Sequence, residues 1–362
     1  MINSNKEFLS LFGWDDFFQS QVLTLSSESL FIGRVINEEK HLYRVQFGID
    51  ENISASVTGK MQFEAMGRVD YPAVGDWVLI HKTSNNERAT IRHILKRKTV
   101  LQRKKVGEVS EIQILATNID YVFITTSMND DLNLGRLERY LTFALDSKAI
   151  PVLILTKADL CPDVEGAVSE VKERFPEVKV HAISVNNFSE TAFFQDYLIE
   201  GKTAVIVGSS GVGKSTLGNY LIGENVIVTQ VIRFDDDKGK HTTTARSMYK
   251  SFYGGLIVDT PGMRELQFSS HEEGMDNLFS DIEELKTRCR FSNCKHETED
   301  DCAILEALEN GQLLPARWKS YNKIQREVRH EMRKHNKWIM AEDRKVWKKR
   351  MVSNRQKFKG QH

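Results

Sequence analysis

The stretch Gly208-Ser209-Ser210-Gly211-Val212-Gly213-Lys214-Ser215 is a complete phosphate-binding loop, and its surroundings have the pattern that such a loop requires. The apolar run at residues 204–207 predicts a strand that leads into the loop, and residues 215–221 predict a helix that follows it. The glycines let the backbone pass close to phosphates, and the loop amides favour their negative charge. Lys214 is expected to neutralise the outer phosphates and the Ser215 hydroxyl to ligate Mg²⁺. The sequence therefore predicts a nucleotide-binding α/β domain.

Two further nucleotide motifs stand in an unusual order around this loop. Thr156-Lys157-Ala158-Asp159 resembles a guanine-reading loop, and it comes before the phosphate loop, whereas in an ordinary GTPase it comes after. Asp259-Thr260-Pro261-Gly262 resembles the switch that senses the third phosphate. All three parts are present in a rotated order, which indicates a circularly permuted GTPase domain.

The guanine-reading motif follows a predicted strand at residues 151–155, at the sheet edge where ligands bind. Asp159 can accept hydrogen bonds from the ring N–H and the exocyclic amine of guanine, a pair of donors that adenine lacks. The Lys157 stem can lie across the base, and Ser184 is expected to begin the remaining base-contact loop. Thr156 stands where Asn is usual, so weaker bracing of the loop is expected.

Magnesium and the third phosphate are expected to be held by the switch and by a polar loop at residues 235–244. Asp259 would hold Mg²⁺ through a water, and the Gly262 amide would touch the third phosphate. Thr243, in the hydroxyl-rich part of the loop, is the predicted second protein ligand of Mg²⁺, with a register uncertain by one residue. An ordinary surface loop is the alternative.

The catalytic group is less evident from the sequence. Many GTPases place a glutamine directly after the switch to orient the attacking water, and Met263 stands there instead. Slow intrinsic hydrolysis is therefore expected, with the site completed by a partner or by a residue of the polar loop. His241 is the candidate, because imidazole can orient water near neutral pH, although it could equally be an exposed loop histidine.

The residues predicted to contact nucleotide are Thr156, Lys157, Asp159, Ser184, Gly208, Ser209, Ser210, Gly211, Val212, Gly213, Lys214, Ser215, Thr216, Thr243, Asp259 and Gly262, with Ser215 and Thr243 also on Mg²⁺.

A second metal site is predicted from three cysteines and a histidine close together in the sequence. Cys289, Cys294, His296 and Cys302 supply three thiolates and one imidazole, a set that binds tetrahedral Zn²⁺ in structural sites. All four positions are filled, so the zinc is expected to be structural rather than catalytic. The remaining cysteine, Cys161, is expected to be a small hydrophobic residue beside the base-reading loop.

The rest of the chain predicts a multidomain α/β protein. Five short strand patterns at residues 31–100 suit a small barrel like the oligonucleotide-binding (OB) fold, although other small barrels look the same. Basic residues at 96–98 and 103–105 suggest a linker, either solvated or in contact with RNA. From residue 120, apolar strands alternate with helices, one of them expected at 188–198, which indicates a mostly parallel sheet.

Charge is distributed unevenly, although the net charge is zero. Residues 317–362 carry 16 Lys and Arg against 4 Asp and Glu, so a polyanionic partner such as RNA is expected. A solvated tail without a partner is the alternative. No apolar run reaches the roughly 18–20 residues that a membrane helix needs, and the N-terminus lacks an apolar signal core, so the chain is expected to be cytosolic.

Together these motifs resemble one family, the bacterial RsgA (YjeQ/YloQ) ribosome-biogenesis GTPases. The resemblance covers roughly residues 31–335 and includes Gly75-Asp76-Trp77-Val78, the Gly-Lys-His-Thr-Thr-Thr loop at 239–244, and the zinc spacing. It implies a cytoplasmic GTPase that acts late in small ribosomal subunit maturation. Members bind the subunit and its rRNA through the barrel and the zinc domain, cycle between GTP and GDP, and are stimulated by the ribosome.

The expected domains are an N-terminal extension (1–30), an OB-like barrel (31–100), a circularly permuted GTPase domain (101–274), a helical zinc-binding domain (275–337) and a basic tail (338–362). The protein is expected to be a monomer without a membrane partner. Two other readings remain: a permuted GTPase whose main partner is a protein, and an RNA-binding protein with a decayed nucleotide site. The complete set of Lys214, Ser215 and Asp259 argues against the second.

Overall fold

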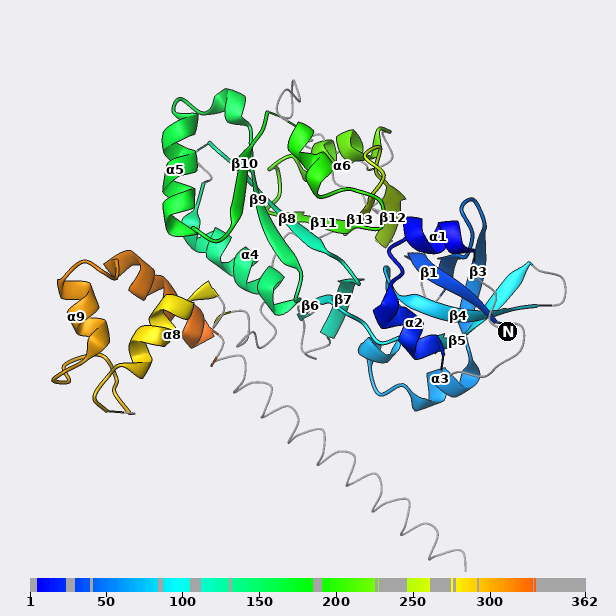
Figure 1. Ribbon diagram of the computed structural model, residues 1–362, viewed down its shortest axis with the longest axis horizontal. Helices are drawn as coiled ribbons and strands as arrows, with labels where there is room; N and C mark the ends of the chain where they lie inside the picture. Colours follow the sequence, from blue (N-terminus) through cyan, green and yellow to red (C-terminus); the bar gives the residue numbers. More distant parts are fainter. Residues whose placement is uncertain are drawn as a thin grey trace, which may run out of the picture. The chain divides into compact units, whose positions relative to one another are not determined.

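The computed structural model describes residues 5–23, 30–39, 42–83, 87–104, 112–129, 132–184, 191–224, 227, 246–260, 275, 278–291, 293–327 and 329. The chain divides into two compact units, and the second contains the described residues from 275 onward (Figure 1). Among the helices of the described part, none is long and apolar enough to cross a membrane.

The N-terminal strands close into a barrel, as predicted. They are β1 Leu30–Glu39, β2 Leu42–Gln46, β3 Asn52–Val57, β4 Trp77–Lys82 and β5 Arg88–Ile94. Strand β1 pairs with β2 and β4, β2 pairs with β3, and the parallel pair β3–β5 and the antiparallel pair β5–β4 complete the ring. Helix α3 (Gly59–Glu64) and the 3-10 helix η1 (Arg68–Asp70) connect β3 to β4. The inward residues include Val35, Val45, Ile80 and Ile91.

The N-terminal residues belong to the packing of the barrel. Helices α1 (Lys6–Leu11) and α2 (Asp16–Val22) place Phe8 and Phe18 against Trp77 of β4, and all three side chains are fully buried. The rings of Phe8 and Trp77 meet edge-on with centroids 5.8 Å apart. Burial of three large aromatic side chains on the outside of the barrel anchors this segment.

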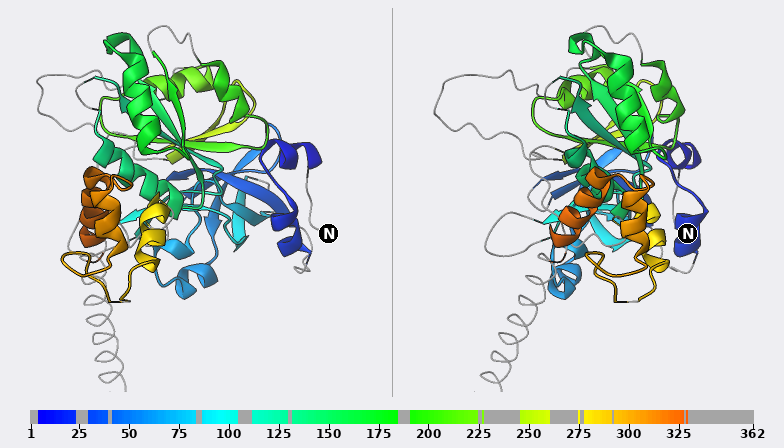
Figure 2. Two further views of the ribbon diagram at one scale, coloured as in Figure 1. Left: turned by 60° about the vertical axis from the view of Figure 1, so that its left-hand side comes forward. Right: turned by 90° about the vertical axis from the view of Figure 1, so that its left-hand side faces the viewer.

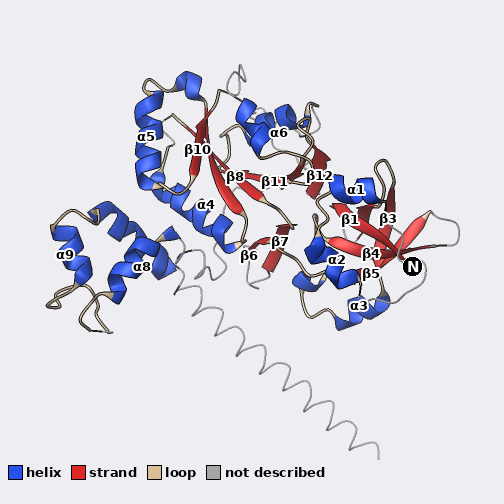
Figure 3. Cartoon of the chain, in the orientation of Figure 1, coloured by secondary structure: helices blue, strands red, loops and turns tan. Residues whose placement is uncertain are grey.

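The central sheet has the predicted parallel core, with the sequence order rotated. Its strands are β8 Tyr121–Ser127, β9 Ile150–Thr156, β10 Lys179–Ala182, β11 Thr203–Gly208, β12 Arg246–Lys250 and β13 Leu256–Asp259. They lie in the order β10-β9-β8-β11-β13-β12 (Figure 1), and only β12 is antiparallel to its neighbour within this set. Figure 3 shows the strands in red. Strand β11, which leads into the phosphate loop, therefore lies between β8 and β13.

Helices cover both faces of this sheet, because residues on both sides of its strands are buried. Leu217 and Leu221 of helix α6 (Lys214–Ile222) pack on the face that carries Phe123 and Ile206. Leu153 of β9, whose side chain points to the other face of the sheet, is equally buried. The other helices of this region are α4 Leu134–Asp146, α5 Val164–Arg174, η2 Ala158–Leu160 and η3 Ala192–Asp196 (Figure 2).

Three parts of this unit differ from the sequence-based expectation. The described part of the expected helix at 188–198 contains only the 3-10 helix η3. Phe194 and Leu198 have the spacing of one helical face, and both are buried although no full α-helix forms. The expected linker at 96–105 contains strand β6 (Val100–Lys104), which pairs antiparallel with β7 (Ile112–Thr117) further along the chain. Strand β12 was not predicted.

Arg97, in the expected basic linker, is a structural residue. Its guanidinium donates to both carboxylate oxygens of Asp76, at 2.8 and 2.7 Å, and to the carbonyls of Val69 and Tyr71. The Asp76 side chain is fully buried, so the pair closes one end of the barrel. This arginine is therefore occupied by the fold and does not serve as a solvated linker cation.

A buried arginine on β1 joins the N-terminal helices, the barrel and the start of the central sheet. Arg34 is 1% exposed and donates to the carbonyls of Phe12, Gly75 and Asn118. Burial lowers the pKa of Arg34 to about 10, while Asp120 and then Asp76 act in the opposite direction. Its charge is retained because the three carbonyls replace the water that folding removes.

The second unit is helical, as predicted. Helices α8 (Ser280–Thr287) and α9 (Ala303–Glu309) pack around Phe279, Ile282 and Ile304. The ring of Tyr321 meets that of Phe279 edge-on at 5.5 Å. This core is small for an independent unit.

Replacing Arg34 with methionine should lower the free energy of unfolding by about 3 kcal/mol, because three buried carbonyls lose a charged donor at once. Urea unfolding followed by tryptophan fluorescence measures this change, since Trp77 lies beside Arg34. Arg44→Met, on an exposed face of the barrel, is the matched control and should change stability by less than about 0.5 kcal/mol. Equal losses in the two variants would contradict the structural role of Arg34.

Candidate nucleotide site and metal centre

The phosphate loop links the end of β11 to the first turn of α6. Gly208 has a φ of 149°, and a Cβ on it would lie 2.1 Å from the carbonyl oxygen of Thr125 in the neighbouring strand. Gly213, at the start of the helix, has a φ of 94°. Side chains are therefore excluded where the loop leaves the sheet and disfavoured where it enters the helix. The Lys214 ammonium donates to the Ser209 carbonyl, across the loop.

Thr156 connects the base-reading motif to the phosphate loop. It is the last residue of β9 and is fully buried. Its hydroxyl donates to the Val212 carbonyl at 2.7 Å and lies 3.2 Å from the carbonyl of Thr126. A bracing contact is therefore present without the amide of the usual Asn. The shorter threonine side chain can make it because the end of β9 lies close to the Val212 carbonyl.

The rest of the base-reading motif is shaped by backbone contacts and by Ser184. Lys157 has left-handed backbone angles (φ 59°), and η2 begins directly after it. The Ala158 amide donates to the Ile183 carbonyl at 3.1 Å. The Ser184 hydroxyl donates to a carboxylate oxygen of Asp159 at 2.8 Å, which orients the exposed carboxylate at this edge of the sheet. The structure thus brings Asp159 and Ser184 together, as the sequence predicted for one base-contact region.

Asp259 ends β13, the strand beside β11, so it lies at the same sheet edge as the phosphate loop. Burial raises the pKa of Asp259, while the Thr260 amide and the charge of Lys214 act to lower it. Because β13 lies directly beside β11, Asp259 at the end of β13 and Lys214 after the end of β11 both lie at this edge of the sheet. That arrangement gives a partly buried carboxylate near the phosphate loop, as a site for a metal–phosphate complex requires.

Three predicted site residues, His241, Thr243 and Gly262, lie outside the described residues and stay predictions. Ser209, Ser210, Gly211, Ser215 and Thr216 lie in the loop and the first turn of α6, where they were expected. Sequence reasoning missed Thr125, whose hydroxyl donates to the Val207 carbonyl at 2.5 Å beneath the loop. A hydroxyl within an apolar strand was the signal that could have identified it.

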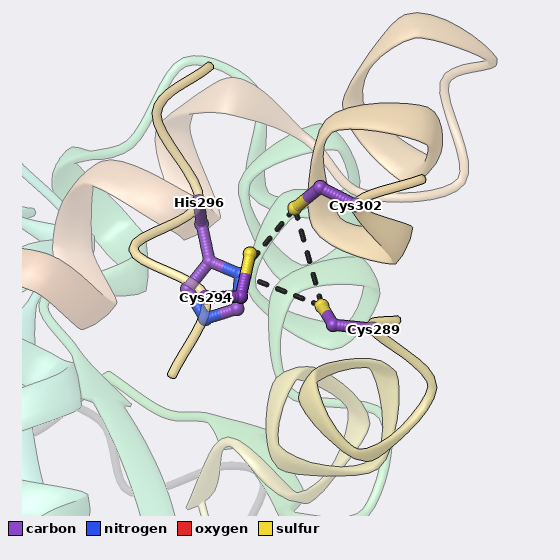
Figure 4. A group of neighbouring side chains, drawn as sticks. All are labelled: Cys289, Cys294, His296 and Cys302. Atoms are coloured by element: carbon purple, nitrogen blue, oxygen red, sulfur yellow. Dashed lines mark hydrogen bonds between the residues drawn. The ribbon is translucent and has the colours of Figure 1, made fainter. Parts of the chain in front are cut away.

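The predicted zinc ligands converge in the second unit (Figure 4). Cys289 follows α8, Cys302 precedes α9, and the other two lie on the loop between these helices. The four ligand atoms lie within 4.8 Å of one another. The Cys289 sulfur is 4.0 Å from that of Cys302, and the His296 Nδ1 is 3.4 Å from the Cys302 sulfur. Tetrahedral zinc with bonds of roughly 2.0–2.3 Å needs such separations, so the residues fit this ion.

Glu299 organises the loop that carries His296. Its carboxylate accepts hydrogen bonds from the amides of Lys295, Glu297 and Thr298, at 2.7, 2.9 and 3.1 Å. His296 itself has a φ of 61°, a conformation that needs support from its neighbours. Zinc bound here would join two helices through a loop with few apolar residues, which is a structural role.

Comparisons with known proteins agree with this architecture. Residues 94–269 match the RsgA GTPase family. A protein of Oceanobacillus iheyensis, named small ribosomal subunit biogenesis GTPase RsgA 1, is 41% identical over 327 residues, which cover 90% of this chain and 92% of that protein. One of Lactiplantibacillus plantarum, named small ribosomal subunit biogenesis GTPase RsgA 2, is 43% identical over 300 residues, covering 83% and 84%.

Two solved structures share the fold. YjeQ from Thermotoga maritima has a TM-score of 0.63 at 24% identity, covering 83% of this chain and 98% of that one. YloQ, described as a circularly permuted GTPase, has a TM-score of 0.61 at 23% identity, covering 84% and 96%. The fold and the site therefore define a circularly permuted P-loop GTPase with a barrel and a Cys3His unit. Because relatives above 40% identity span most of its length, the chain belongs to the RsgA GTPase family.

Replacing Cys302 with alanine should abolish stoichiometric zinc and expose the second unit to proteolysis, because three ligands hold the ion far less tightly than four. Metal analysis after purification without chelators, together with limited proteolysis, measures both effects. Cys161→Ala is the control, since Cys161 is a half-buried free cysteine outside the ligand group, and it should retain one zinc per chain. Equal zinc contents in the two variants would disprove the assignment.

Proposed function

We propose that this protein hydrolyses GTP to GDP as a late assembly factor of the small ribosomal subunit, which it binds through rRNA. The observation that carries the nucleotide assignment is the hydrogen bond from Thr156 to the Val212 carbonyl. It links the base-reading motif to the phosphate loop across 56 residues of sequence. The names of the relatives from Oceanobacillus iheyensis and Lactiplantibacillus plantarum support the assignment to small ribosomal subunit biogenesis.

Guanine would be read by Asp159, whose carboxylate is oriented by Ser184. A carboxylate there accepts from the ring N–H and the amine of guanine and has no such pair of partners on adenine. The backbone after Ser184 would contact the guanine oxygen, and Lys157 would lie across the base. The phosphates would bind the loop amides between Gly208 and Ser215.

Mg²⁺, when bound with GTP, would neutralise charge on the outer phosphates. Ser215 and Thr243 would hold it, with Asp259 acting through a water. Met263 cannot orient the attacking water, so intrinsic turnover would be slow and His241 would be the group that positions the water. Contact with the ribosomal subunit would raise the rate by completing this arrangement.

Basic surface residues support an rRNA partner. The barrel exposes Arg44 on β2, Arg88 and Arg92 on β5, and Lys96 directly after β5. Small barrels of this class often bind nucleic acid on their strands. The excess of Lys and Arg after residue 317 adds further cationic character. A cytoplasmic monomer acting on the subunit is the form that we propose.

GTP turnover should rise by roughly 10²–10⁵ when purified small subunits are added, which is the range that completion of a GTPase site can give. The measurement is phosphate release at saturating GTP, with large subunits as the control. Subunit binding should weaken steeply as salt increases, because phosphate contacts release counterions. Salt-insensitive binding would instead favour a protein partner, and an unchanged rate would disprove stimulation.

Thr156→Val should weaken binding of both GTP and GDP about tenfold, because the buried Val212 carbonyl loses its donor while side-chain volume is kept. Titration with fluorescent nucleotides measures both affinities. Thr156→Ser keeps the hydroxyl and should bind nearly as well as the unmodified protein. Equal affinities for the valine and serine variants would show that this bond does not support the nucleotide site.

A further inference from the structure

The barrel and the predicted magnesium-side carboxylate share one continuous line of strand pairing. Asn37 of β1 lies opposite Ser247 of β12, and Ser247 lies opposite Asp259 of β13. The Asn37 side-chain amide also donates to the Ser247 hydroxyl at 2.7 Å. Three adjacent strands therefore connect the barrel to the residue that ends at the phosphate-loop edge of the central sheet.

An ion-pair cluster reinforces the same junction one residue further along. Glu38 lies opposite Arg246, and its carboxylate contacts the Arg246 guanidinium at 3.3 Å. The other oxygen of Glu38 pairs with Arg68 of η1, within the barrel. The side chains of Glu38 and Arg246 are 9% and 11% exposed, so solvent screens this contact weakly.

Glu38 is shared by two cations, Arg246 of β12 and Arg68 of η1, which makes its charge important to the cluster. Burial lowers the pKa of Arg246, and burial together with the charge of Arg246 lowers the pKa of Arg103 on β6. Removal of the Glu38 charge would take away the carboxylate that the guanidiniums of Arg246 and Arg68 share. Loss of one partner in such a cluster loosens the contact that it makes, because the remaining charges repel.

The strand that carries Arg246 and Ser247 begins directly after the hydroxyl-rich segment at 242–244 in the sequence. Strand β13, which pairs with β12 on the side away from β1, ends at Asp259. A displacement of β12 relative to β1 would therefore shift the residue opposite Asp259. Conversely, a ligand that fixes Asp259 would fix the edge of the barrel.

We propose that Asn37 and Glu38 are positioning residues that couple the barrel to the nucleotide site through β12. They touch neither nucleotide nor metal, and they act by fixing Ser247 and Arg246 beside Asp259. Binding of a partner to the barrel and binding of GTP with Mg²⁺ then favour each other, because coupling between two sites is reciprocal. The partner side of this inference rests on the proposed ribosomal function, whereas the junction itself does not.

Hydrogen exchange on the full chain alone tests the junction without any ribosome. In the unmodified protein, a non-hydrolysable GTP analogue with Mg²⁺ should slow exchange of the β13, β12 and β1 amides. In Asn37→Ala and Glu38→Gln, protection should persist in β13 and be lost in β1. Glu39→Gln, the adjacent exposed carboxylate, is the matched control and should behave as the unmodified protein. Retained protection of β1 in both junction variants would overturn the inference.

Turnover measurements then test the partner side. Stimulation by small subunits should fall at least roughly fivefold in Glu38→Gln, with KM for GTP nearly unchanged, and should be unaffected in Glu39→Gln. Equal stimulation of both variants would overturn the coupling. Absence of stimulation in the unmodified protein would instead disprove the proposed function, and the exchange experiment would still decide the inference. Unfolding midpoints within a few degrees of the unmodified protein would exclude general loss of structure.

Discussion

The guanidinium of Arg34 is the contact on which the arrangement of the first unit depends. It supplies donors to carbonyls from the N-terminal segment, the barrel and Asn118, the residue directly after β7, which no single strand pairing joins. Its neighbour Gly75 has a φ of 99°, and a Cβ there would lie 2.0 Å from the Thr117 carbonyl. The backbone therefore approaches closely enough for Arg34 to bridge both segments, and a bulkier residue at 75 would separate them.

The permuted order has a structural consequence for the edge of the central sheet. The chain enters this sheet at β8, so the barrel is attached in sequence to the middle of the sheet. Strand β12 would be an exposed edge strand, with unpaired backbone groups that favour association with other chains. Pairing with β1 covers its first residues. The barrel thus protects the edge and, through the same hydrogen bonds, becomes continuous with the nucleotide-binding sheet.

The sequence predicted those strands whose own residues show an apolar run or a regular alternation of polar and apolar side chains. The alternation at residues 42–46 and the apolar runs at 151–155 and 204–207 mark strands regardless of what surrounds them. Strand β12 has no such pattern, because it carries the charged residues Arg246 and Lys250, and the partner of Arg246 is Glu38 of β1, 208 residues away in sequence. The sequence left Arg97 as either a solvated or an RNA-contacting residue, because its partner, Asp76, is 21 residues away.

The site shows the same division between local and long-range information. The phosphate loop was predictable because its glycines and Lys214 form one contiguous motif, and the zinc ligands lie within 14 residues. The bond from Thr156 to Val212 was not predictable, since the substitution of Asn suggested a weaker loop. Whether a shorter side chain reaches its acceptor depends on the separation of β9 from the phosphate loop, which only the folded sheet determines.

The two units differ in what holds them together, and this difference follows from size. The first buries a continuous sheet and can tolerate a buried charge such as Arg34, because all three of its guanidinium nitrogens donate to carbonyls. Among its described residues, the second has a small apolar cluster around Phe279 and Tyr321, and the loop between α8 and α9 is dominated by polar residues. Apolar burial alone gives such a unit little stability, so the free energy of binding zinc at Cys289 and its partners must form a large part of its folding free energy.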